Sequence, residues 1–112
     1  MKKKIKKVLL SEMHKGWFIG NFEPSLLKTE VVEVGVKHYK AGDTEAKHYH
    51  KGACEFTVII SGKVQMNEEI YEAGDIVIIE PHTPTDFKVL EDCVTTVVKI
   101  PGVANDKFMV EK

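Results

Sequence analysis

The sequence has 112 residues and no arginine, so all 16 of its basic residues are lysines. Arginine supplies most bidentate contacts to phosphate groups and guanine edges, because its planar guanidinium matches both. Its absence argues against a nucleic-acid-binding module and against tight gripping of nucleotides. The formal net charge of -1 points the same way, since it gives no whole-molecule field to attract nucleic acid or an anionic membrane.

Cysteines and long apolar runs are also scarce. Cys54 and Cys93 are too few for a disulfide framework, so we expect two reduced thiols, with a single bridge left open. Near the N-terminus only residues 8–10 form an apolar run, which is far too short for a signal-peptide core or a membrane span. A cytoplasmic protein without a membrane partner is therefore expected.

Short β-branched runs separated by turn signals make up most of the chain, and no stretch has a sustained helical period of apolar residues. This pattern of many short strands separated by turns predicts an all-β antiparallel sandwich or barrel. The expected strands are residues 5–10, 31–39, 55–60, 63–66, 69–72, 75–80, 87–90 and 95–100, with turns that include 61–62 and 91–92.

The length allows one domain, residues 1–112, with a single core. Within it, residues 1–30 are expected to hold a lysine-rich edge strand and an aromatic segment. Residues 31–100 form the barrel. Residues 101–112 form a tail that either docks through its apolar side chains or crosses to a partner subunit.

Two segments carry apolar side chains that should be buried against other parts of the protein or against a partner. The aromatic segment contains Trp17, Phe18 and Phe22, which we interpret as packing residues, with a ligand lid or a dimer contact as alternatives. The run 76–79 has no polar alternation, so both of its faces should be covered, in the middle of a double sheet or in a dimer.

The strongest functional signal is a pair of histidines followed by a carboxylate. His48 and His50 are two residues apart, so both imidazoles project from the same face of an extended chain. Glu55 opens the next strand. Two imidazoles and one carboxylate that converge in this way suit iron, manganese, nickel or zinc, with open positions for a substrate.

The spacing of Gly42, His48, His50, Glu55 and Gly62 resembles the complete first motif of the cupins. The resemblance covers roughly residues 31–100. It implies a cupin-type jelly-roll β-barrel, also called a double-stranded β-helix, with the three polar side chains facing its interior.

A second cupin-like motif is weaker. Gly74 and Asp75 open a strand, and residues 81–87 resemble the turn that carries the fourth ligand histidine in the family. Thr85 stands where that histidine would fall. His82 lies in the same turn but has the opposite strand parity to Thr85.

The resemblance implies a small-molecule-binding protein with a divalent metal at His48, His50 and Glu55, such as a metal-dependent dioxygenase or isomerase. An alternative is a metal-free isomerase or epimerase of sugars or nucleotide sugars. There His50 or His48 would be the base, and the acid would be one of three tyrosines, Tyr39, Tyr49 or Tyr71. A non-catalytic binding module for a carbohydrate or small acid is the third possibility.

Strand parity also predicts the walls of the ligand chamber. They should be mostly apolar, which suits many ligands and identifies none. His38 is a further candidate for an inward-facing group. Small cupins are commonly homodimers, so the resemblance implies the same assembly here. The predicted pocket residues are Thr57, Ile59, Met66, Ile78, Thr85, Phe87 and Val97.

Overall fold

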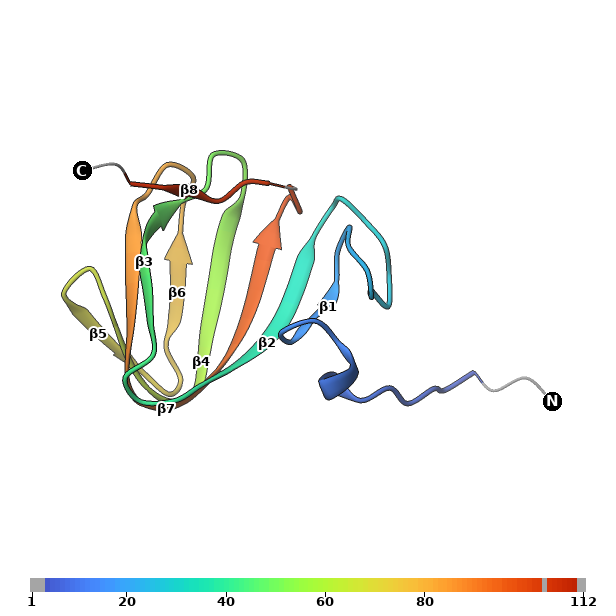
Figure 1. The fold of residues 1–112 in the computed structure, drawn as a ribbon, viewed down its shortest axis with the longest axis horizontal. Helices are drawn as coiled ribbons and strands as arrows, with labels where there is room; N and C mark the ends of the chain where they lie inside the picture. The colour runs from blue at the N-terminus through green and yellow to red at the C-terminus, as the bar shows by residue number, and fades with distance from the viewer. Residues whose placement is uncertain (1–3, 104, 111–112) are drawn as a thin grey trace.

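The structure, a computed structural model, describes residues 4–103 and 105–110. Within them the chain forms eight β-strands and one short 3-10 helix, arranged as a barrel from which the N-terminal segment extends (Figure 1). No helix in this part of the chain has the length and apolar character needed to cross a membrane. The elements are η1 (Leu10–Glu12), β1 (Trp17–Ile19), β2 (Glu33–Tyr39), β3 (Thr44–Tyr49), β4 (Cys54–Met66), β5 (Glu69–Glu72), β6 (Ile76–Ile79), β7 (Thr85–Ile100) and β8 (Phe108–Met109).

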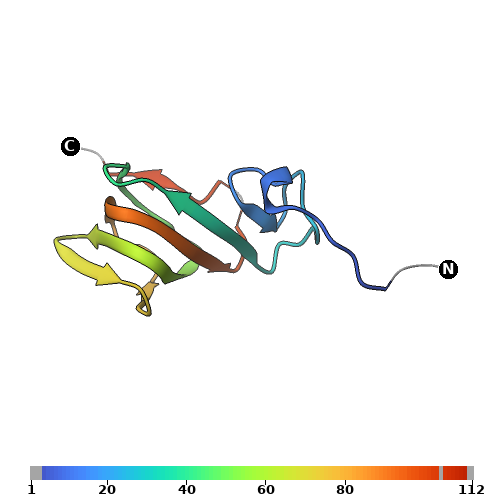
Figure 2. The ribbon, with the colours of Figure 1, turned by 90° about the horizontal axis from the view of Figure 1, so that it is seen from below.

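The long strands β4 and β7 connect the two halves of the barrel. The first part of β7 pairs with β3 and its second part with β2. In the same way, β4 pairs first with β6 and then with β5, while β4 and β7 pair with each other along most of their length. Because both strands are shared, the eight strands form one antiparallel sheet whose two halves curve around one core (Figure 1, Figure 2). The all-β prediction is confirmed.

The turns predicted at residues 61–62 and 91–92 are wrong. Both segments lie inside continuous strands, where the register of β4 against β7 shifts. Gly62 has a φ of +86°, and a Cβ there would clash with the backbone of Asp92 on the neighbouring strand. Glycine therefore allows a close approach and a bend, where the sequence pattern indicated a chain reversal.

The strand predicted over residues 5–10 is wrong as well. Residues 5–9 pair with no strand, and η1 begins at Leu10. Ile5 is 89% exposed, so this lysine-rich segment buries no apolar face that would fix a strand register. The aromatic segment does reach the sheet, because Trp17 of β1 pairs with Gly35 of β2.

Apolar side chains at alternate positions of β4 and β7 form the core between the two halves of the sheet. Ile59, Val64 and Val89 are almost completely buried there. Cys93 belongs to the same core, and both it and Cys54 are free thiols.

The run 76–79 is covered on one face only. Val77 is buried, whereas Ile76 and Ile78 are 63% and 62% exposed. Since β6 pairs only with β4 among the described residues, it is an edge strand of the curved sheet. Cover on both faces within one chain is therefore wrong, and cover by a second copy remains a prediction.

Candidate functional site

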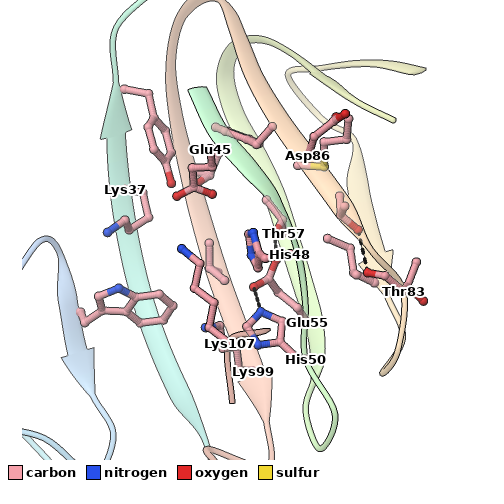
Figure 3. Close-up of a pocket in the computed structure, with 18 of the residues that line it drawn as sticks. Lys37, Glu45, His48, His50, Glu55, Thr57, Thr83, Asp86, Lys99 and Lys107 are labelled. Atoms are coloured by element: carbon pink, nitrogen blue, oxygen red, sulfur yellow. Dashed lines mark hydrogen bonds and ion pairs between the residues drawn. The ribbon is translucent and has the colours of Figure 1, made fainter. Parts of the chain in front are cut away.

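A cavity of about 300 Å³ opens on the inner face of the barrel. His48, His50 and Glu55 lie side by side on its wall (Figure 3), and His50 is only 6% exposed. His48 lies next to the end of β3, His50 follows that strand directly, and Glu55 is the second residue of β4. The predicted pocket residues that line this cavity are Thr57, Met66, Thr85, Phe87 and Val97.

Two predicted pocket residues lie elsewhere. Ile59 is fully buried in the core instead of lining the cavity. Ile78 points away from the cavity and is exposed, so its prediction is wrong. Glu55 of β4 pairs with Ile79 of β6, and paired residues share a face of the sheet, so Ile79 takes the inward place.

The two imidazoles and the carboxylate converge without touching. The ring centroids of His48 and His50 are 5.4 Å apart, with the rings nearly perpendicular. Nε2 of His50 lies 3.8 Å from Oε1 of Glu55. The hydroxyl of Thr57 donates to Oε2 of the same carboxylate at 3.3 Å, which holds Glu55 on the wall of the cavity.

Both histidines are oriented through the same ring atom. Nδ1 of His48 lies 3.0 Å from the carbonyl oxygen of Ala46, and Nδ1 of His50 lies 2.8 Å from that of Asp106. A carbonyl oxygen can only accept a hydrogen bond, so each Nδ1 carries the proton and donates it. In a neutral ring Nε2 is then left with a free lone pair.

Asp106 fastens the loop that follows His50. Its buried carboxylate accepts hydrogen bonds at 2.9–3.1 Å from the backbone N–H groups of Lys51, Gly52 and Ala53. Burial alone would raise the pKa of this carboxyl, but these hydrogen bonds outweigh it and hold the pKa below its usual range. The segment after β7 is thereby tied to the loop at the site.

For His50, burial lowers the pKa, and the nearby positive charge of Lys99 lowers it further. The negative charge of Glu55 acts in the opposite direction and raises it. The net direction favours the neutral imidazole, which is the form that can ligate a metal or accept a proton. Of the three tyrosines considered as acids, only Tyr39 lines the cavity. Burial, with the charges of Glu45 and Glu55, raises the pKa of the Tyr39 hydroxyl, so it stays protonated.

The two candidate residues of the second motif, Thr85 and His82, lie in different places. Thr85 pairs with His48 in the sheet and lines the cavity, next to the imidazole pair. His82 is exposed and stacks against Tyr49 outside the cavity lining. His38 is also exposed, since in β2 it is the alternate residues Lys37 and Tyr39 that face the cavity.

By chemistry, the donor set fits a divalent metal, since it offers two imidazole nitrogens and one carboxylate. Within residues 4–103 and 105–110, no three His, Cys, Asp or Glu side chains already lie in a metal-ligating arrangement. The three side chains of this site thus line the same cavity wall, but their donor atoms are not arranged around one point at metal–ligand distances.

Several cavity residues escaped the sequence analysis. Lys37 and Lys99 face the cavity beside Trp17, and the buried Asp106 supports the loop behind His50. Parity placed Lys37 on the same face of β2 as Tyr39, and that was the available signal for its role. For Asp106 no local signal existed, because its hydrogen-bond partners lie more than 50 residues away.

The fold and the cavity define a small β-barrel that encloses a ligand-sized chamber with two imidazoles and a carboxylate on its wall. This chain belongs to the cupin family: the family model described as a cupin domain matches residues 35–99, more than half of the sequence. No curated protein matches the chain at the level of sequence.

Solved structures share its fold. A conserved protein with a double-stranded β-helix domain from Klebsiella pneumoniae is 23% identical, with a TM-score of 0.69 over 100% of this chain and 98% of that one. Oxalate decarboxylase from Bacillus subtilis is 20% identical, with a TM-score of 0.64 over 73% of this chain but only 24% of its own length. KdgF from a Halomonas species is 18% identical, with a TM-score of 0.61 over 69% and 74%. The predicted double-stranded β-helix is confirmed.

Proposed function

We propose that the chain binds a small molecule in this cavity beside a divalent metal held by His48, His50 and Glu55, and acts on it as a metal-dependent enzyme of the dioxygenase or isomerase kind. One observation carries the proposal: each histidine donates from Nδ1 to a backbone carbonyl, so both Nε2 atoms are free to ligate. Metal-ligating histidines are generally held in this way. A bound metal would supply Lewis-acid polarisation of a ligand oxygen.

Other residues of the cavity support this role. Thr57 orients the carboxylate of Glu55 from the next position on the same face of β4. Thr85 is smaller than the histidine found there in the family motif, which leaves room for a ligand atom beside His48. Met66, Phe87 and Val97 make part of the chamber wall apolar. The prediction of a mostly apolar chamber is wrong, because lysine, carboxylate and threonine side chains line it as well. Among the solved structures with this fold, one of Bacillus subtilis oxalate decarboxylase concerns its Mn(II) centres, which makes manganese a metal to include in the test.

Elemental analysis of protein purified without chelator tests the metal. Near-stoichiometric iron, manganese, nickel or zinc is expected in the wild type and should be lost in His48→Ala and Glu55→Ala. His38→Ala is the matched control, since His38 is exposed and lies outside the cavity lining. A wild type that is purified without metal and takes up none when it is added would contradict the proposal.

A metal-free isomerase is the second candidate. Neutral His50 and protonated Tyr39 line the same cavity, so the pair holds the protonation states of a base and an acid at neutral pH. Activity that survives chelation and falls in Tyr39→Phe would favour this candidate over the metal enzyme. The absence of arginine leaves a nucleotide sugar with lysines alone for its diphosphate.

A homodimer is part of the proposal, and so is the cytoplasmic location expected from the sequence. Three isoleucines on the outer face of the sheet support the dimer, because Ile60, Ile76 and Ile78 are more than half exposed in the single chain. Phe56 lies between Ile78 and Val98 in the strand register, which extends the apolar surface from β6 across β4 to β7.

A further inference from the structure

One side of the cavity is basic. Four lysines line it, Lys15, Lys37, Lys99 and Lys107. In Figure 3, Lys37, Lys99 and Lys107 lie on one side of the site together with Glu45, while Thr83 and Asp86 lie on the other. Among the described residues, no carboxylate oxygen lies within 4.0 Å of any of the four amino groups.

The sheet register gathers two of these lysines around one aromatic ring. Trp17 lies against Gly35, where a Cβ would come within 2.7 Å of the indole. Glycine at this position therefore gives the ring its place on the inner face. The amino groups of Lys37 and Lys99 lie over that ring, 5.4 Å and 5.0 Å from its centroid. Each is attracted to the π-face, but the two positive charges repel each other, and an anion nearby would relieve that repulsion.

A buried hydroxyl in the same place has no hydrogen-bond partner among the described residues. Thr95 is 1% exposed, lines the cavity and pairs with Lys37 across β7 and β2. Its Oγ1 is buried and makes no hydrogen bond within the described part of the chain. Buried hydroxyls are nearly always hydrogen-bonded, since burial without a partner is unfavourable. A ligand atom in the cavity would provide that partner.

We propose that Lys37, Lys99 and Thr95 form a carboxylate-binding subsite, so that the small molecule is a small organic acid. Lys99 pairs with Glu55 in the β4–β7 register, so the subsite adjoins the imidazole–carboxylate wall. The other oxygen atoms of the acid then face His48, His50 and Glu55. This second half of the assignment rests on the proposed function, whereas the subsite itself does not.

The charge of the cavity favours a single carboxylate. Its four lysines face three carboxylates, Glu45, Glu55 and Asp86, which leaves a formal charge of +1 with neutral histidines. In the metal-free protein a monoanion balances that charge and a phosphate dianion exceeds it. Lysine also binds as a point charge, without the planar fork with which arginine grips phosphate.

Calorimetric titration with three hydroxy acids, glycolate, lactate and gluconate, tests the subsite against their amides, which keep the shape and lose the charge. At least one acid should bind the wild type, and its amide should bind about tenfold more weakly or not at all. Lys37→Met and Lys99→Met should each weaken the acid about tenfold, and Thr95→Val about threefold. Lys88→Met is the matched control, because Lys88 is an exposed lysine of β7 outside the cavity lining.

Equal affinity for acid and amide, no binding of any of the three acids, or unchanged affinity in both lysine variants would overturn the subsite. Melting curves of all variants confirm that each remains folded. Titrations of chelator-treated and metal-loaded protein separate the two proposals. Lysine-dependent acid binding in a protein that never takes up metal keeps the subsite and refutes the metal centre. Metal uptake with lysine-independent binding does the reverse.

Discussion

Around the cavity, both faces of the sheet region formed by β2, β7, β4 and β6 depart from the pattern of an ordinary barrel wall. On the inner face, Lys37, Thr95, Lys99 and Glu55 bring charge and hydroxyl groups toward the cavity. On the outer face, apolar residues lie where water would be expected, with Ile78 62% exposed. Antiparallel sheets usually place apolar residues inside and polar residues outside. This departure supports the two proposals, that the cavity binds a ligand and that the outer face contacts a second copy of the chain.

Removing the Asp106 carboxylate, which supports the loop beside the inner face, should have the largest effect on stability. Asp106→Ala leaves the backbone N–H groups of Lys51, Gly52 and Ala53 without their acceptor and loosens the loop after His50. We expect a loss of about 3 kcal/mol or more in the free energy of unfolding, measured by urea denaturation.

Asp106→Asn keeps an acceptor oxygen and should lose less. The folded-state pKa of Asp106 is lowered, so its contribution is present above the unfolded pKa and is lost as the pH falls through the folded value. The wild type should therefore lose stability below about pH 4, and Asp106→Asn should lose less there. Equal stability of wild type and Asp106→Ala would contradict the assigned support.

A substitution on the outer face can disrupt the proposed dimer interface without changing the cavity on the inner face. Ile78→Lys places a charge in the proposed interface, and we expect the dimer dissociation constant to rise about 30-fold or more, measured by sedimentation. Ile70→Lys is the control, because Ile70 is also exposed but lies on β5, in the other half of the sheet. A wild type that is monomeric at all concentrations would refute the role of this face.

Making the inner face more like the outer one should have a smaller effect. Thr57→Val replaces the hydroxyl that donates to Glu55 with a methyl group of similar volume. We expect metal affinity to fall about tenfold, measured by competition with a chelating dye, while the free energy of unfolding changes by less than about 1 kcal/mol. A fall in stability with unchanged metal affinity would make Thr57 a packing residue only.

The smallest effect concerns pH. The folded-state pKa of His50 is lowered, so the unfolded chain takes up the proton first as the pH falls, and stability decreases below about pH 6.5 until the folded pKa is reached. In chelator-treated protein, His50→Gln should lack this part of the decrease between pH 7 and 5. Identical pH profiles of the two proteins would contradict the direction of the shift.

The sequence predicted more of the fold than of the site. Alternation and turn residues indicated most strands, and the spacing of His48, His50 and Glu55 was enough to place these residues near one another. Gly62 was misleading, because a glycine that allows strands to approach closely looks the same in sequence as one that ends a strand.

Two kinds of information were missing from the sequence pattern. Parity identifies two faces of a strand but not which face is inside, and for Ile78 the register with β4 decided this. Lys37 and Lys99 resemble the chain's other lysines until β2, β7 and Trp17 bring them together. Asp106 depends on a contact between distant segments, which no local pattern contains.

The tie between Asp106 and the loop after His50 makes the end of the chain a reporter of what the cavity holds. A ligand that requires His50 in its present orientation also favours the docked position of the segment that orients it, and this linkage is reciprocal. Occupancy should therefore slow proteolytic cleavage after Lys107, an exposed lysine that follows Asp106. The rate of cleavage at this bond would then report binding of a colourless acid or metal without an activity assay.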